Sequence, residues 1–164
     1  MDGNAWADRQ RWGKIVEAVI FVGVQGAGKS TFYQERFFDT HLRINLDMLK
    51  TRHRERRLLQ ACVETSQAFV VDNTNPTRAE RAVYIQTAKE AGFRVLGYYF
   101  QSKVEDCKRR NEQRPSDKQV PLRGILGTAG RLELPSLGEG FDELHYVRIA
   151  EVGGFVVEEW QDEV

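Results

Sequence analysis

The chain of 164 residues balances 24 Lys and Arg against 24 Asp and Glu, so its formal net charge is zero, and 41% of its residues are hydrophobic. A neutral chain does not coat nucleic acid through bulk charge, although a local basic site is still allowed. The length suits one compact domain over residues 1–164, with an N-terminal extension at 1–14 and an acidic tail at 158–164.

Apolar runs of strand length alternate with longer charged segments of helical period, which is the pattern of an α/β fold. The expected strands are 17–24, 42–45, 68–72 and 94–100. The helix before the last of these is marked at both ends, because Thr77 and Glu80 form a capping box and Gly92 is placed to end it. Near the C-terminus, two β-rich runs flank Gly153 and Gly154 and predict a hairpin with a two-residue turn.

The first expected strand leads into "GVQGAGKST" (23–31), which satisfies G-x-x-x-x-G-K-[ST] between a strand and a helix. Its glycines let backbone N–H groups face phosphate oxygens, and a helix that begins near Lys29 points its positive end at them. Lys29 would bridge the β and γ phosphates, and Ser30 would offer its hydroxyl to Mg²⁺. An ordinary glycine turn is the alternative. The expected ATP contacts in this loop are Gly23, Gln25, Gly26, Ala27, Gly28, Lys29, Ser30 and Thr31.

Asp72 ends the third expected strand in "AFVVDNTN". Parallel strands deliver such residues to the ligand edge of the sheet, where Asp72 would help Ser30 to hold Mg²⁺, through a water. The alternative makes Asp72 and Asn75 ordinary turn and cap residues, which Asx side chains favour in such places.

Asp47 follows the second expected strand in "INLDMLK" and should rise from the same edge as the phosphate loop. A carboxylate there can accept a proton from an acceptor hydroxyl. The alternative is an N-cap for a helix through "MLKTRHRERRLLQ", and periodicity alone favours the cap. Spacing does not decide between the two.

Ser102 and Glu105 form a second capping box, at the start of "SKVEDCKRRNEQR". Arg110 and Arg114 are four residues apart and are expected on one helical face, with the polar stretch 115–121 behind them as a lid. Guanidinium groups that close over a nucleotide neutralise charge on the transferring phosphoryl group. The alternative is a solvated basic helix end that complements the helix dipole.

Taken together, these segments resemble the kinase domain of polynucleotide 5'-kinases, in particular of the polynucleotide kinase-phosphatase type. The resemblance runs from about Val19 to Leu144, and its motifs are "GVQGAGKST", "INLDMLK", "VVDNTNPTRAERAVYIQTAKEAGFRV", "CKRRNEQR", "VP" and "LPSLGEGFDEL". It implies a P-loop NTPase with a parallel sheet flanked by helices, of the adenylate-kinase type with a short lid. The implied activity is phosphorylation of 5'-hydroxyl ends of DNA or RNA by ATP and Mg²⁺, as in nucleic-acid repair.

The resemblance also implies roles for single residues. Asp47 falls on the general base, Lys29 and Ser30 on the phosphate-loop pair, Asp72 on the acidic residue of D-N-T-N, and Arg114 on the lid arginine that closes R-N-x-x-R. This correspondence favours Asp47 as a base over a cap.

The residues that would bind the acceptor strand depart from the pattern of the polynucleotide kinases. Some members place an arginine three residues after the catalytic aspartate to hold the substrate's phosphate, whereas this chain has Lys50, which supplies charge but no planar fork. The cluster "RHRERR" at 52–57 could grip the phosphates of the acceptor strand, or it could be a solvated helix face with Glu55 interleaved. The expected substrate contacts are Lys50, Arg54 and Asn75.

Two other functions stay open, a small-molecule kinase and a nucleotide-dependent module whose lid closes to dock a partner. The chain has neither the D-x-D-x-T of the partner phosphatase nor a ligase's K-x-D-G, so a free-standing kinase is expected. Cys62 and Cys107 have no CxxC neighbours, and no apolar stretch approaches the roughly 20 residues of a membrane span. We therefore expect a cytoplasmic protein without membrane contact.

Overall fold

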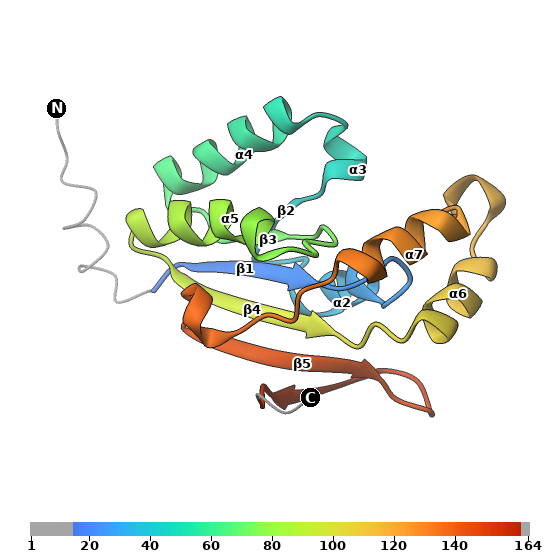
Figure 1. Ribbon diagram of the computed structural model, residues 1–164. Helices are drawn as coiled ribbons and strands as arrows, with labels where there is room; N and C mark the ends of the chain where they lie inside the picture. Colours follow the sequence, from blue (N-terminus) through green and yellow to red (C-terminus); the bar gives the residue numbers. More distant parts are fainter. Residues whose placement is uncertain (1–14, 162–164) are drawn as a thin grey trace, which may run out of the picture.

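A central sheet organises the computed structural model, which describes residues 15–161. The strands are β1 (Glu17–Val22), β2 (Leu42–Ile44), β3 (Phe69–Val71), β4 (Arg94–Phe100), β5 (Glu143–Ile149) and β6 (Phe155–Glu159). Their order is β2-β3-β1-β4-β5-β6, with parallel pairing from β2 to β5 and antiparallel pairing of β6 with β5 (Figure 1). The predicted α/β fold with a parallel sheet is confirmed, and all four strands expected from the sequence are present.

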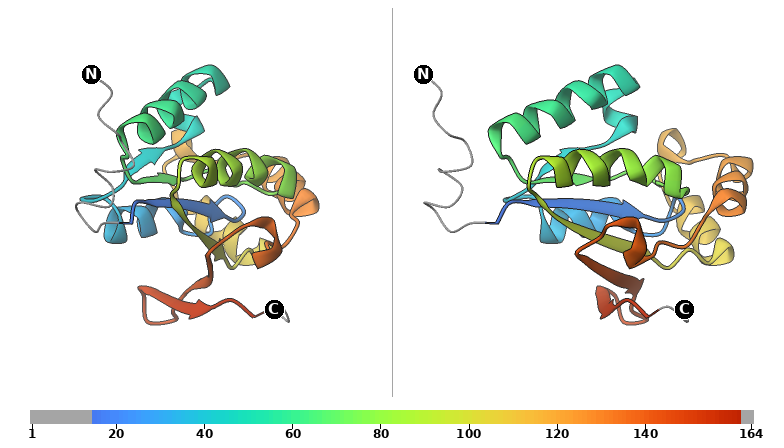
Figure 2. Two further views of the ribbon diagram at one scale, coloured as in Figure 1. Left: turned by 90° about the vertical axis from the view of Figure 1, so that its left-hand side faces the viewer. Right: turned by 60° about the vertical axis from the view of Figure 1, so that its left-hand side comes forward.

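Helices cover both faces of this sheet. They are α2 (Lys29–Arg36), α3 (Leu46–Leu49), α4 (Arg52–Thr65), α5 (Arg78–Glu90), α6 (Val104–Glu112) and α7 (Leu122–Arg131), with short 3-10 turns η1 (Ser116–Lys118) and η2 (Leu137–Glu139). α4 and α5 lie on one face and α2 and α6 on the other, while α7 lies beyond the carboxyl ends of β1 and β4 (Figures 1 and 2). No helix of the described residues has the length and apolarity of a membrane span.

The alternation of side chains along β1 divides the core into two layers. Ala18 and Ile20 pack under α4 and α5, whereas Val19 and Phe21 pack under α2 and α6. Phe21 meets Phe100 at 4.9 Å between ring centroids, and all of these side chains are fully buried. A strand buried on both faces is typical of a parallel sheet and explains the continuous apolar run before the glycine loop.

One of the two predicted capping boxes is confirmed. Thr77 and Glu80 cap α5 in both directions, and Gly92 follows the helix with a φ of 77°. The box at Ser102 is wrong, because α6 begins two residues later, after Lys103, without a side-chain cap. The Ser102 hydroxyl is engaged elsewhere. It donates to Phe100 O at 2.7 Å and accepts from Val24 N at 3.0 Å, so it ties the glycine loop to the end of β4.

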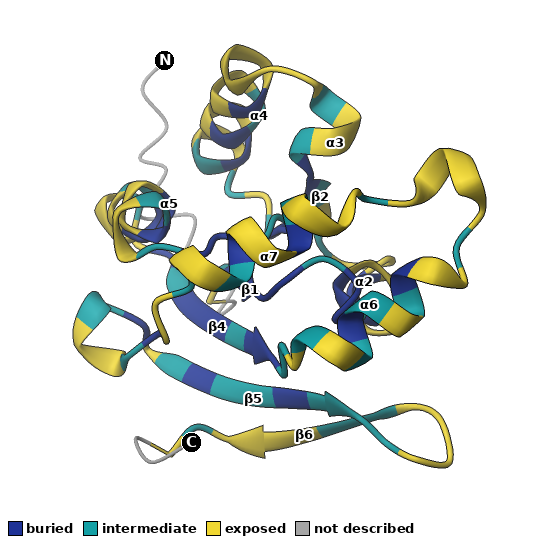
Figure 3. Cartoon of the chain, turned by 45° about the vertical axis from the view of Figure 1, so that its right-hand side comes forward, coloured by how far each residue is buried: buried dark blue, intermediate teal, exposed yellow. Residues whose placement is uncertain are grey.

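The C-terminal hairpin is confirmed, but its loop is longer than two residues. Ile149 pairs with Phe155, and residues 150–154 form the loop, in which Gly153 and Gly154 have positive φ. The expected acidic tail also begins too early, since Glu158 and Glu159 belong to β6, the strand at the exposed edge in Figure 3. The expected extension at 1–14 lies outside the described residues.

Candidate functional site

The carboxyl ends of β1, β2 and β3 open into a cleft of about 280 Å³. Of the residues expected at the site, those that line this cleft are Gln25, Gly26, Lys29, Ser30, Asp47, Asp72, Asn75 and Arg114. Those that do not line it are Gly23, Ala27, Gly28, Thr31, Lys50, Arg54 and Arg110. The fold thus gathers the glycine loop, the two aspartates and one arginine from four separate stretches of the sequence.

The glycine loop has the backbone that its motif requires. Gly26 and Gly28 have φ of 83° and 97°, a region that other residues rarely adopt. A Cβ at Gly26 would lie 2.6 Å from the carbonyl oxygen of Cys107, so the loop also packs too tightly against α6 for a side chain. α2 begins directly after Gly28, and Lys29 and Ser30 in its first turn line the cleft, so this helix end with its unbonded N–H groups lies at the cleft.

Lys29 is buried against the loop that carries it. Its Nζ donates to Gly23 O and Val24 O, each at 2.8 Å, and the residue is only 8% exposed. Burial lowers the pKa of Lys29 to about 8, partly offset by the Asp72 carboxylate. The ammonium is therefore desolvated and held by uncharged oxygens, which a phosphate oxygen can replace with a stronger, charge-assisted contact.

Ser30 and Asp72 lie together as predicted, with the Ser30 hydroxyl donating to Asp72 Oδ2 at 3.1 Å. These are hard oxygen donors of the kind Mg²⁺ prefers, and Mg²⁺ usually completes its shell with waters and substrate phosphates. Within residues 15–161, no group of three or more His, Cys, Asp or Glu could hold a metal ion. The pair therefore fits Mg²⁺ only together with a bound phosphate.

Arg43 joins this pair and was missed in the sequence. Its guanidinium contacts Asp72 Oδ2 at 2.7 Å and donates to the Ser30 hydroxyl at 3.0 Å. Arg43 lies on β2, which pairs with β3. The one feature of the sequence that could have indicated a role for Arg43 is the presence of a charged residue inside a very short strand. The buried Asp72 carboxylate, which is 2% exposed, is thus paired with the Arg43 guanidinium. This cation lies at the same Asp72 and Ser30 oxygens that were expected to hold the metal.

Asp47 is not a helix cap. Asn45 caps α3, with its Oδ1 accepting from Met48 N at 3.0 Å, and Thr51 caps α4 separately. The single helix expected here is broken at Lys50, whose φ is 70°. Asp47 lies in the first turn of α3, exposed, and its carboxylate has no hydrogen bond or ion pair with any described residue. A free carboxylate thus faces the same cleft as Lys29.

Two asparagines that the sequence analysis did not single out fix α3 to the end of β3. Asn45 Nδ2 donates to Asp72 O at 2.6 Å, and Leu46 N donates to Asn73 Oδ1 at 2.8 Å. These contacts set the position of Asp47, the next residue along, relative to Asp72.

The two lid arginines do not share a helical face. α6 ends at Glu112, before Arg114, because the residue before Pro115 is disfavoured in the α conformation. Arg114 lines the cleft, and its guanidinium makes no hydrogen bond or ion pair with a described residue. Arg110 instead donates to Gly26 O at 2.7 Å and so supports the glycine loop from outside the cleft.

The basic segment 52–57 is not interleaved with an acidic side chain at its surface. Glu55 is 3% exposed and points inward, so the expected interleaving of Glu55 is wrong, whereas the basic side chains of the segment are exposed to solvent. Arg54 is exposed and donates to Leu49 O at 3.3 Å, away from the cleft, whereas Arg52 lines the cleft. Arg52 is therefore the residue of this segment that shares the cleft with Asp47.

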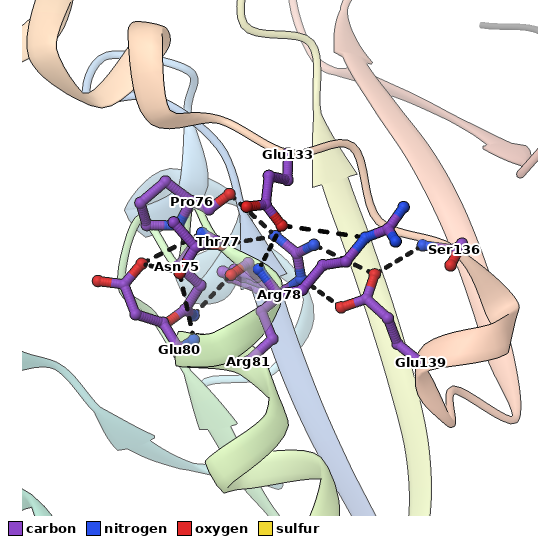
Figure 4. Close-up of polar contacts among 10 residues, drawn as sticks. Asn75, Pro76, Thr77, Arg78, Glu80, Arg81, Glu133, Ser136 and Glu139 are labelled. Atoms are coloured by element: carbon purple, nitrogen blue, oxygen red, sulfur yellow. Dashed lines mark hydrogen bonds and ion pairs between the residues drawn. The ribbon is translucent and has the colours of Figure 1, made fainter.

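A buried arginine holds the D-N-T-N-P turn beside the cleft (Figure 4). Arg81, with no exposed surface, contacts both carboxylate oxygens of Glu139 at 2.8 and 3.1 Å and donates to the carbonyls of Asn75 and Pro76. The Asn75 amide itself donates to Phe21 O at 2.8 Å. Asn75 was expected to contact substrate, but its side-chain amide is bonded to the backbone, as in an ordinary turn residue. Through Arg81, Glu139 ties the segment after α7 to the same turn.

Comparison with known proteins places this arrangement in a family. Residues 19–135 match the family model described as AAA domain. The chain belongs to this AAA domain family. Over 135 residues it is 29% identical to the bifunctional polynucleotide phosphatase/kinase of Schizosaccharomyces pombe. The aligned segment covers 80% of this chain but only 33% of that protein. The resemblance expected from the motifs is thereby confirmed, and the chain spans about a third of the length of this relative.

Solved structures of the same fold include Kti12 from Chaetomium thermophilum, with a TM-score of 0.62 at 16% identity over 80% of this chain and 88% of that one. A gluconokinase from Sinorhizobium meliloti 1021 has a TM-score of 0.59 at 18% identity over 84% of this chain and 85% of that one. At such identities the likeness concerns the fold alone.

Proposed function

We propose that the chain is an ATP-dependent kinase that transfers the γ-phosphoryl group of ATP to the 5'-hydroxyl end of DNA or RNA. The observation that carries this proposal is the free carboxylate of Asp47 in one cleft with Lys29, Ser30 and Asp72. A carboxylate with no partner, opposite a phosphate loop, is suited to receive a proton.

On the nucleotide side, the loop N–H groups and the N-terminus of α2 hold the phosphates. Lys29 leaves the carbonyls of its own loop and binds the β and γ phosphates. Mg²⁺, when held by Ser30 and indirectly by Asp72, supplies positive charge to the phosphate oxygens. Arg114, unpaired in the cleft, neutralises charge that builds up on the transferring group.

The chemical step is a direct in-line transfer. The 5'-oxygen of the acceptor forms a bond to the γ-phosphorus while the bond from that phosphorus to ADP breaks. Asp47 accepts the proton that the hydroxyl loses. No side chain forms a covalent intermediate, so the reaction needs the acceptor and ATP in the cleft at the same time.

A polynucleotide acceptor is supported by the similarity to the Schizosaccharomyces pombe phosphatase/kinase and by the surface of α4. With Glu55 buried, the exposed side chains from Lys50 to Arg57 carry no negative charge. The exposed basic residues are Lys50, Arg52, His53, Arg54, Arg56 and Arg57. A local positive surface on a neutral protein suits the phosphates of a nucleic-acid strand rather than bulk charge binding.

The proposal is tested with ATP labelled at the γ position and a panel of acceptors. The panel contains 5'-hydroxyl DNA, 5'-hydroxyl RNA, the same strands with 5'-phosphate ends, and small polyols. We expect label on the 5'-hydroxyl strands alone. Label on a small polyol, or label released only as phosphate, would point to a metabolite kinase or to a nucleotide-driven binding module instead.

A further inference from the structure

Arg43 is the one cation in the range 15–161 that is hydrogen-bonded to both residues expected to hold Mg²⁺. Its Nε and Nη2 lie 2.8 and 2.7 Å from Asp72 Oδ2, and Nη2 also donates to the Ser30 hydroxyl at 3.0 Å. The sheet register brings Arg43 to this place, because it pairs with Val70 on β3. Val70 and Asp72 are two residues apart, so their side chains point to the same face of the sheet.

Arg43 approaches Asp72 from behind the cleft. Asp72 and Ser30 line the cleft, whereas Arg43 does not. The Arg43 guanidinium lies over the ring of Tyr33, with 5.8 Å between Cζ and the ring centroid. Arg43 and Ser30 both bond to Oδ2 of Asp72, and Oδ1 has no hydrogen bond with any residue that the structure describes. One oxygen of this carboxylate therefore carries the pairing contacts, and the other is free.

The charge of Asp72 is balanced by two cations. Arg43 pairs with it directly, and the Lys29 ammonium interacts with it electrostatically. Asp72 is buried, so water and salt screen these interactions only weakly. A divalent cation beside Ser30 and Asp72 would thus meet one carboxylate and two positive charges. Bound ATP reverses this balance, because its phosphates bring several negative charges to the same place.

From this arrangement we infer that Arg43 prevents Ser30 and Asp72 from binding Mg²⁺ alone, so that the metal site depends on bound nucleotide. The inference rests on the proposed function and deepens it. Arg43 acts through Asp72, because it balances the charge at Oδ2 and leaves Oδ1 for the site that the phosphates complete. Removal of the Arg43 charge should therefore create a site for a divalent cation that needs no nucleotide.

The test measures binding of Mn²⁺, a spectroscopic substitute for Mg²⁺, to the full chain without nucleotide, from the loss of the EPR signal of free Mn²⁺. For the parent we expect no saturable binding at millimolar Mn²⁺. Arg43→Gln removes the charge but keeps a donor for Asp72. It should raise the affinity for Mn²⁺ by roughly tenfold or more, because a paired cation changes the proton affinity of a carboxylate by at least as much.

Three further variants isolate the charge of Arg43. Arg43→Lys keeps the charge and should behave as the parent. Arg36→Gln removes a cation from the last turn of α2 and should leave Mn²⁺ binding unchanged. Asp72→Asn, added to Arg43→Gln, should abolish the gain in affinity.

Circular dichroism without metal establishes that each variant is folded. If Arg43→Gln is unfolded, millimolar Mg²⁺ should refold it while NaCl of the same ionic strength does not, because a ligand that binds only the folded chain stabilises it. Failure to refold would contradict the inference. So would saturable Mn²⁺ binding by the parent, an Arg43→Gln affinity equal to that of the parent, or a gain that persists with Asp72→Asn.

These measurements contain neither ATP nor an acceptor, so the inference can fail while label transfer to 5'-hydroxyl strands succeeds. A protein that transfers no label to any acceptor would instead overturn the proposed function.

Discussion

The glycine loop and the α3–α4 corner face each other across one cleft, but their residues arrive there in different ways. The loop is a continuous stretch, 23–31, whose conformation follows from its own glycines and the strand before it. The corner depends on contacts made across the fold, such as Asn73 to Glu55 and Leu46 to Asn73. The conformation of the proposed nucleotide side is thus encoded locally, whereas that of the proposed acceptor side depends on tertiary packing.

The largest expected effect is on the nucleotide side. Lys29→Ala removes the cation that we propose contacts the transferring phosphate, and we expect the transfer rate to fall by on the order of a thousandfold. The measurement is label transfer to a 5'-hydroxyl oligonucleotide, with Lys89→Ala, at the partly exposed ion pair with Asp142, as the control. Activity near the parental level would remove the nucleotide half of the proposal.

Arg114 should act on the chemical step rather than on ATP affinity. Its guanidinium has no described partner in the cleft, so Arg114→Ala should lower the single-turnover rate by on the order of a hundredfold with little change in the Kd of ATP. Arg110→Ala is the matched comparison, because Arg110 supports Gly26 and should mainly weaken ATP binding. Equal effects of both changes on the two quantities would contradict this division.

The buried ammonium of Lys29 predicts a pH dependence of stability. Its pKa falls from 10.5 to about 8 on folding, so the folded protein releases a proton that the unfolded chain keeps over this window. Stability from this group therefore rises between about pH 8 and 10.5 and is lowest below pH 8. Without nucleotide, Lys29→Met should be more stable than the parent below pH 8, by at most about 3 kcal/mol.

Urea unfolding across this range measures the difference. The gap between Lys29→Met and the parent should close as the pH approaches 10.5. A gap that stays constant over the same range would show that the buried charge is not its source.

A smaller effect is expected from Glu55, which supports the proposed acceptor side through Asn73. Glu55→Gln replaces one carboxylate oxygen by a donor, so at least one of its three partners loses its acceptor, at a cost of about 1–3 kcal/mol in unfolding free energy. The KM for the oligonucleotide should rise while the Kd of ATP stays unchanged. Glu64→Gln, on the exposed face of the same helix, serves as the control. A change in the Kd of ATP as large as the change in the KM for the oligonucleotide would contradict separate nucleotide and acceptor sides.

The parts of the fold that could be predicted from the sequence are those with local signals. The capping box of Thr77, the apolar strands and the glycine loop all depend on neighbours in the chain. α7 was not expected, because its three glycines give it a low helix propensity, and its Ile125 is buried only through packing against the core cluster of α2 and α6.

Part of the candidate site could be predicted as a set of residues, but its geometry could not. Arg43 was missed because its pairing with Asp72 follows from the strand order, which the sequence does not reveal. That Arg52 lines the cleft while Lys50 does not could not be foreseen either, since it depends on the break at Lys50 and on the inward turn of Glu55.

The central claim is that Asp47 serves the acceptor. Asp47→Asn keeps the size of an exposed side chain that has no described partner, so the thermal melt with and without Mg·ATP should match the parent. The rate of 5'-phosphorylation should fall by on the order of a hundredfold or more, while Asp39→Asn, at another exposed aspartate, leaves it unchanged. An Asp47→Asn protein that melts normally and phosphorylates the oligonucleotide at the parental rate would contradict the account.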